Sequence, residues 1–196
     1  IVIMLIIICI IEVMCINKNE LKKKYNEKKI VTEDFIEDDI SGTFEEHGSS
    51  MCSMGIDSNG KYFATGEIGK ISIWDINSFS IINQIQGATG QEFYRCIDFS
   101  PEINILGTGL LNDNTIRIYN YRTGDLIKTL IGHTNTVTAI DFSPNGKLLA
   151  SSSDDGSIKL WDVVTGKEIN TFKVDKTYIK SVIFTNDGNY LIFSGN

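Results

Sequence analysis

A serine, a histidine, an aspartate and a tryptophan lie close together in the C-terminal half of the sequence. Segment 151–162 reads SSSDDGSIKLWD, and His133 precedes it by 18 residues. Ser, His and Asp are the side chains of a hydrolase triad, in which the His takes the proton of the Ser and the Asp orients the His. The same residue types also form buried networks in which every polar group has a partner. The surrounding sequence must decide between these two interpretations.

Composition limits the classes of function. The chain has 196 residues, a formal net charge of -7 and 42% hydrophobic residues, which is enough for one domain with a packed core. The acidic balance argues against nucleic-acid binding, which depends on clustered Lys and Arg. No C-x-x-C pair occurs among the four cysteines, so a reducing setting in the cytoplasm or nucleus fits better than secretion. The cysteines are Cys9, Cys15, Cys52 and Cys96.

Two segments precede the globular part. Residues 1–16 are almost wholly apolar but short for a spanning helix, which needs about 20 residues, and Glu12 interrupts them. They are either a membrane anchor followed by a cytosolic Lys cluster, or part of a fragmentary or misassigned N-terminus. Residues 17–39 are charged in blocks and fit a linker or a charged surface helix.

The rest of the chain repeats. Similar segments begin at residues 57 (DSNGKYFA), 100 (SPEINILG), 143 (SPNGKLLA) and 185 (TNDGNYLI), a spacing of about 43 residues. A second marker follows three of them, as ISIWD, IRIYN and IKLWD. Self-similarity at this spacing is the signature of a repeat architecture.

Each repeat predicts β structure. In the third repeat, TVTAIDFS, KLLASSS, SIKLWDV and KEINTF are rich in residues that favour strands. The turns between them contain Asn-Gly, Asp-Gly and Thr-Gly, which tolerate positive φ. One repeat is therefore expected to be a four-stranded antiparallel meander.

The third repeat, GHTNTVTAIDFSPNGKLLASSSDDGSIKLWD, resembles the WD-repeat family over its whole length, including the Gly-His opening and the Trp-Asp close. The resemblance covers roughly residues 40–196 and implies an all-β fold of propeller blades. The blades are expected at about 47–86, 87–130 and 131–172, with a partial blade at 173–196, so the ring is incomplete in this chain. Residues 40–44 match an outer strand, which either closes a ring or belongs to an earlier blade.

The resemblance also implies a structural role for the residues of the opening segment. WD repeats use a His, a Ser or Thr, an Asp and a Trp as a buried hydrogen-bonded set. The matching positions are His133, Ser151, Asp155 and Trp161, with Ser153 as the alternative to Ser151. No exposed nucleophile or oxyanion hole is indicated, so an enzyme is not expected.

The other repeats match this set in part. In the first repeat His47, Thr65 and Trp74 match, whereas Ile68 takes the Asp position. In the fourth, Asp175 stands at the His position.

The second repeat departs further. Thr108 and Asp113 match, but Tyr119 replaces the Trp and no His precedes them.

The function that the resemblance implies is a non-catalytic scaffold or adaptor that binds other proteins, with no cofactor and no metal. Candidate partner contacts align with the start of the first strand of a blade, where Phe93 and Tyr178 correspond to Thr136. Arg95 and Lys180 lie two residues further on and add charge. Packing of both aromatic rings between blades is the competing interpretation. A membrane-tethered adaptor is the alternative function and requires residues 1–16 to be an anchor.

Overall fold

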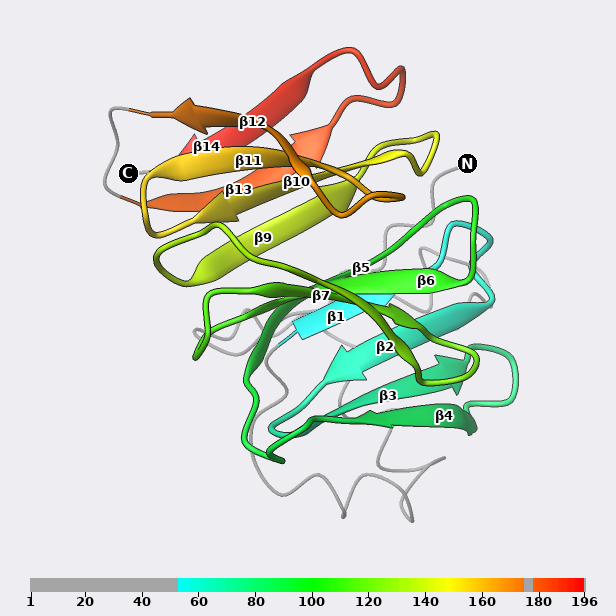
Figure 1. The fold of residues 1–196 in the computed structure, drawn as a ribbon. Helices are drawn as coiled ribbons and strands as arrows, with labels where there is room; N and C mark the ends of the chain where they lie inside the picture. Colours follow the sequence, from blue (N-terminus) through cyan, green and yellow to red (C-terminus); the bar gives the residue numbers. More distant parts are fainter. Residues whose placement is uncertain (1–52, 175–177, 196) are drawn as a thin grey trace, which may run out of the picture. The chain divides into compact units, whose positions relative to one another are not determined.

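The computed structural model describes residues 53–174 and 178–195, which form fourteen strands in four antiparallel sheets (Figure 1). The sequence predictions for residues 1–16, 17–39 and 40–44 lie outside these residues. Within the described part of the chain, no helix is long and apolar enough to cross a membrane.

The strands follow the predicted meander in sequence order. The first sheet contains β1 (Ser53–Ile56), β2 (Tyr62–Gly66), β3 (Lys70–Asp75) and β4 (Ile81–Gln86). The second contains β5 (Tyr94–Phe99), β6 (Ile105–Leu110), β7 (Ile116–Asn120) and β8 (Leu126–Leu130). The third contains β9 (Val137–Phe142), β10 (Leu148–Ser153), β11 (Ser157–Asp162) and β12 (Glu168–Lys173). A hairpin of β13 (Ile179–Phe184) and β14 (Leu191–Gly195) follows.

The turns use the predicted glycines. Gly146 ends the Asn-Gly turn between β9 and β10 at φ 64°, and its N–H donates to the carbonyl of Ser143. Gly156 does the same between β10 and β11 at φ 77°, with Ser153 as acceptor. Glycine enters this left-handed region without the steric cost of a Cβ atom, so each hairpin closes in a tight turn.

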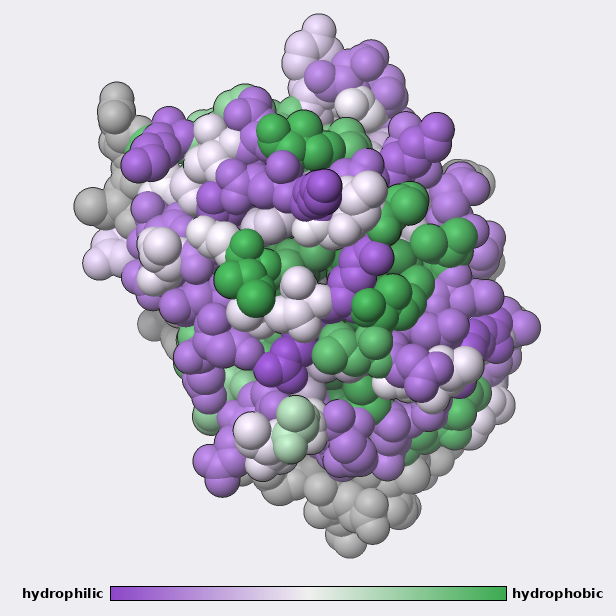
Figure 2. Space-filling view, in the orientation of Figure 1, coloured by the Kyte–Doolittle hydropathy of each residue, from purple (hydrophilic) through white to green (hydrophobic). Residues whose placement is uncertain are grey.

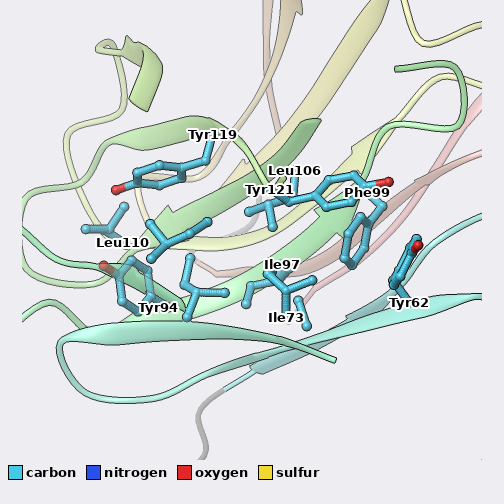
Figure 3. Close-up of a cluster of buried hydrophobic side chains, with 12 residues drawn as sticks. Tyr62, Ile73, Tyr94, Ile97, Phe99, Leu106, Leu110, Tyr119 and Tyr121 are labelled. Carbon is cyan, nitrogen blue, oxygen red and sulfur yellow. The ribbon is translucent and has the colours of Figure 1, made fainter. Parts of the chain in front are cut away.

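The sheets pack face to face around three apolar clusters. The first cluster joins the first and second sheets (Figure 3), the second joins the second and third, and the third joins the third sheet to the final hairpin. The first strand of each sheet lies beside that of the next, in the order β1, β5, β9, β13. This is the arrangement of adjacent propeller blades, and the described residues do not close a ring.

An aspartate carboxylate links the second sheet to the third, and another links the third sheet to the final hairpin. Asp98 on β5 accepts the backbone N–H of Phe142 on β9 at 2.8 Å, and Asp141 on β9 accepts that of Phe184 on β13. Burial raises the pKa of Asp98 to about 7, against the hydrogen bond from Phe142. Burial likewise raises the pKa of Asp141. These two contacts add a polar link to the apolar packing between sheets.

The meander places the loops at two ends of each sheet. The loops that lead into the first strand and those between the second and third strands share one end, here called the upper face. The turns between the first and second strands, and between the third and fourth, share the other end, here called the lower face. The β1–β2, β5–β6, β9–β10 and β13–β14 turns of the lower face lie together on the right in Figure 1.

Candidate functional site

The third sheet brings His133, Ser151, Asp155 and Trp161 together on the upper face. His133 Nδ1 lies 2.8 Å from Asp155 Oδ2, and His133 Nε2 lies 2.8 Å from Ser151 Oγ. The indole N–H of Trp161 donates to the same Ser151 Oγ at 2.8 Å. Since an ionised carboxylate only accepts, Nδ1 carries the proton and the Ser151 hydroxyl donates to Nε2. Every polar atom in this chain of contacts has a partner.

Burial fixes the charge state of the set. Burial lowers the pKa of His133, and the hydrogen bond that Nδ1–H donates to the Asp155 carboxylate opposes this shift only in part. Burial works against ionisation of Asp155, but hydrogen bonds from Ser157, Thr134 and His133 hold its pKa below the ordinary value. The set therefore contains a neutral imidazole and a carboxylate near neutral pH.

Ser151 has the position but not the accessibility of a nucleophile. Its exposed fraction is 0%, and its hydroxyl already contacts both His133 and Trp161. Ser153, the other candidate for this position, donates instead to the backbone carbonyl of Asn135. A substrate carbonyl has no path to Ser151 in this arrangement, so the set has the geometry of a structural network.

Sequence reasoning missed one member of the network. The Ser157 hydroxyl donates to Asp155 Oδ1 at 2.6 Å and lies 3.3 Å from His133 Nδ1. Asp155 Oδ1 also accepts the backbone N–H of Ser157. The available signal for Ser157 was the sequence Asp-Gly-Ser at 155–157. In such a turn the Asp side-chain oxygen often accepts the backbone N–H of the residue two positions later.

The first sheet keeps the Trp end of the set. The Trp74 indole N–H donates to Thr65 Oγ1 at 3.0 Å, and the ring of Phe63 stacks on Trp74 with centroids 5.7 Å apart. Ile68 stands where Asp155 stands in the third sheet and is 39% exposed. His47 and Asp175, the candidates for the His position in the first and fourth repeats, lie outside the described residues.

The second sheet does not bring Thr108 and Asp113 into one network. Thr108 is fully buried, and its hydroxyl has no hydrogen-bond partner in the part of the chain that the structure describes. Asp113 is exposed and pairs with Arg117 at 2.8 Å. The physical reason is the residue change, because Tyr119 lacks the indole N–H and no His links the two positions.

Glu92 organises the upper loop of the second sheet instead, and the sequence reasoning missed it. Its buried carboxylate accepts the backbone N–H groups of Thr89 and Gln91 at 3.0 and 3.1 Å and lies 3.4 Å from Arg117 Nη1. Burial opposes its ionisation, but hydrogen bonds from Thr89, from the backbone N–H of Glu92 itself and from Arg117 lower the pKa of Glu92 to about 2. A Cβ on Gly87 would come within 2.1 Å of Glu92 Oε2, so a side chain there would displace the Glu92 carboxylate from its present position. In the sequence, the available signal was an acidic residue, Glu92, just before the run that forms β5.

The four predicted partner contacts lie at the upper end of the first strands. Tyr178 is 53% exposed, and Phe93 is half-buried and bridges to Ile68 across the first and second sheets. Neither ring pairs with another aromatic ring among the described residues. Neither belongs to an apolar cluster in that part of the chain.

Arg95 and Lys180 occupy irregular positions of their strands. The register shifts between Tyr94 and Cys96 in β5, and between Ile179 and Ser181 in β13, so each basic residue is the extra residue of a bulge. Bulges re-aim a side chain away from the regular pleat. Both side chains are exposed, and neither forms an ion pair with a described residue.

Comparison with known proteins agrees with this geometry. The family model described as "WD domain, G-beta repeat" matches residues 39–75 and 124–162. Pre-mRNA-processing factor 19 of Oryza sativa subsp. japonica is 32% identical over 162 residues, which cover 79% of this chain and 29% of that protein. The chain belongs to the WD-repeat family. Its four sheets are therefore propeller blades, three of them four-stranded.

Other relatives of this chain have different names. Periodic tryptophan protein 2 of Arabidopsis thaliana is 31% identical over 110 residues, covering 56% of this chain and 12% of that protein. Apoptotic protease-activating factor 1 of Homo sapiens is 32% identical over 146 residues, covering 69% of this chain and 11% of that protein. The chain spans less than a third of the length of these three relatives.

Proposed function

We propose that this WD-repeat chain is a non-catalytic scaffold that binds other proteins within a larger complex. The observation that carries the proposal is the upper rim, defined here as Phe93, Arg95, Tyr178 and Lys180. It presents an aromatic ring and a bulged cation in two separate blades. The equivalent positions in the third blade are Thr136 and Thr138, so blade formation does not require these residues. Aromatic and Arg side chains on a rigid scaffold are typical anchors of protein interfaces.

The burial and hydrogen bonding of His133, Ser151, Asp155 and Trp161 support a role without catalysis. Ser151 is buried and saturated with hydrogen bonds, and no group of three or more His, Cys, Asp or Glu in the described residues is placed to hold a metal. A fluorophosphonate probe should therefore leave Ser151 unlabelled in the wild-type protein. Labelling that disappears in His133→Ala would contradict the proposal.

The setting we propose is the cytoplasm or the nucleus. The relatives include Pre-mRNA-processing factor 19 and U3 small nucleolar RNA-associated protein 21 homolog, whose names refer to RNA processing and to nucleolar RNA. The acidic chain, with a net charge of -7, is suited to contact proteins of such assemblies and not the RNA itself.

The test is isolation of the tagged full-length gene product from its own cells, followed by mass spectrometry. A double variant, Phe93→Ala with Tyr178→Ala, should lose specific partners at unchanged abundance and thermal stability. The matched control is Thr136→Ala at the equivalent position of the third blade, which should keep them. If both variants retain the same partners as wild type, the rim is not the contact surface.

A further inference from the structure

A second cluster of cations and aromatic rings lies on the lower face, opposite the upper rim. Arg122 Cζ lies 4.4 Å from the ring centroid of Tyr62 and 5.4 Å from that of Tyr121. Lys61 Nζ lies 5.1 Å from the same Tyr62 centroid. Tyr62 and Lys61 come from the first blade, whereas Tyr121 and Arg122 come from the second, so the cluster spans the junction of the two blades.

The rings of the cluster belong to the end of the core between these blades. The centroids of Tyr62 and Tyr121 are 6.0 Å apart, and Phe99 meets Tyr121 edge-on at 5.1 Å. Figure 3 shows these three rings together at one end of the apolar cluster. The rings are buried, whereas Lys61 and Arg122 are exposed at the surface beside them.

The backbone around both cations is fixed by side chains. Asp57 Oδ1 accepts the N–H groups of Lys61 and Tyr62 at 2.7 and 2.9 Å. Asn83 of the first blade donates to the carbonyls of Tyr121 and Arg122 at 3.0 and 3.2 Å, across the junction. Both cation-bearing turns are thus held in place before any ligand arrives, which lowers the cost of binding.

The two cations converge without an acid between them. Neither Lys61 nor Arg122 forms an ion pair with a residue that the structure describes. Asp75, which lies near Lys61, directs Oδ1 to the backbone N–H groups of Asn77 and Ser78. The two like charges repel each other at one ring, and a cation–π contact at an exposed site offsets this repulsion only weakly.

The next junction shows that blade packing does not need this cluster. Backbone N–H groups of Ile76, Tyr121 and Val163 donate to the carbonyls of Lys61, Asn104 and Lys147 respectively, which fixes the equivalent positions. At the junction of the second and third blades, Asn104 therefore replaces Lys61 and Ile105 replaces Tyr62. Val163 and Val164 replace Tyr121 and Arg122 there, and Ile105 and Val163 pack together in the apolar core. The same geometry is built from neutral residues.

We propose that Lys61, Tyr62 and Arg122 form a binding site for a phosphorylated side chain of a partner protein. A phosphate group carries close to two negative charges and three acceptor oxygens, which matches two cations and one hydroxyl donor. Arg presents a planar fork of donors to such a group, and Lys supplies a compact charge. The pKa of the Tyr62 hydroxyl is lowered by Lys61 first and also by Arg122, as expected where both cations approach the hydroxyl.

The net charge of the chain favours a phosphorylated protein over RNA or a membrane as the source of the phosphate. The net charge is -7, so an extended polyanion such as RNA or an anionic membrane is repelled by the rest of the surface. A single phosphoryl group on a flexible protein segment contacts Lys61 and Arg122 without placing further negative charges against the acidic surface. The site is separate from the upper rim, so its test is independent of the proposed scaffold contacts there.

The test is a fluorescence anisotropy titration of the full chain with a labelled nine-residue Gly/Ala/Ser peptide that contains one phosphoserine. Wild-type protein should bind it saturably and should not bind the unphosphorylated twin. Arg122→Gln and Lys61→Gln should each weaken binding about tenfold, the loss of one charge-assisted hydrogen bond. Lys147→Gln removes the equivalent lysine of the third blade and should bind like wild type.

Circular dichroism melting of each variant separates lost binding from lost folding. Lys61 and Arg122 are exposed in turns, so both variants should melt within a few degrees of wild type, and Arg122→Lys should recover part of the affinity. Equal affinity in wild type, Arg122→Gln and Lys61→Gln, equal binding of both peptides, or no saturable binding would overturn the site. So would binding to vesicles that contain phosphatidylinositol phosphates in place of the peptide.

Discussion

The second and third blades share one strand order but treat the same buried position differently. In the third blade, Ser151 donates to His133 and accepts from Trp161. In the second blade, Thr108 occupies the equivalent position on β6, and its hydroxyl has no partner among the described residues. A blade of this family can therefore form without the complete hydrogen-bond set seen in the third blade.

The second blade forms without this set because it packs into two apolar clusters and because the Glu92 carboxylate holds its upper loop. The second blade contributes to both large clusters, through Ile97 and Leu106 on one side and Ile116 and Ile118 on the other. Its upper loop is held by the Glu92 carboxylate, which accepts two backbone N–H groups. The comparison shows that burial of apolar surface stabilises the blade, whereas the polar set fixes the geometry of the loop.

The largest effect is expected at Trp161, which has packing and polar roles at once. Trp161→Ala should lower the free energy of unfolding by about 3–5 kcal/mol, as is typical for removal of a buried Trp. Urea denaturation followed by circular dichroism measures the change. Trp161→Phe keeps most of the packing but removes the donor to Ser151, so it should cost less. A Trp161→Ala protein that unfolds at the wild-type urea concentration would show that the set contributes nothing to stability.

Ser151→Ala should have the next largest effect. It leaves the indole N–H of Trp161 and Nε2 of His133 buried without a partner, at a cost of about 1–3 kcal/mol. The same denaturation assay applies. Ser153→Ala is the control on the same strand, since that hydroxyl contacts only the Asn135 carbonyl and the Asp155 N–H and lies outside the set. Equal losses in the two variants would argue against a special role for Ser151.

Asp98, the carboxylate that links the second blade to the third, should make stability depend on pH. Its folded pKa of about 7 lies above the ordinary value of 3.8 for an Asp side chain, so the folded state retains the proton to higher pH than the unfolded chain. The stability that this proton confers is complete below the unfolded pKa and is lost as pH rises towards 7. His133 has the opposite effect, because its lowered pKa means that the unfolded state gains a proton at higher pH than the folded state, and stability falls as the pH drops.

Comparison of Asp98→Asn with wild type isolates the Asp98 contribution. Melting temperatures at pH 5, 6, 7 and 8 should show a wild-type advantage that shrinks as pH rises, while His133 contributes equally to both proteins. Asp98→Asn still offers an amide oxygen to the N–H of Phe142, so the fold should persist. A difference between the two proteins that stays constant across this range would place the pKa of Asp98 outside it.

The sequence was most informative where a repeat stays close to the family pattern. In the third blade the sequence pointed to His133, Asp155 and Trp161, because each of them falls at the spacing of the family pattern. Ser151 and Ser153 could not be separated, since both have side chains on the same side of β10 and only the register with Trp161 distinguishes them. Glu92 and Arg117 were missed because they meet across 25 residues, and neither belongs to the family pattern.

The smallest effect is the sharpest test of the comparison between the two blades. Thr108→Val exchanges a hydroxyl for a methyl group of similar size at a position with 0% exposure. If the hydroxyl is unsatisfied, its removal relieves a desolvation cost, and the protein should gain between zero and about 1 kcal/mol. Ser151→Ala, at the equivalent position, should lose stability in the same assay. The opposite signs follow from the partner that Trp161 provides and Tyr119 does not. A loss of more than about 1 kcal/mol in Thr108→Val would mean that this hydroxyl has a partner in solution, and the two blades would then differ in the identity of their polar contacts and not in their presence.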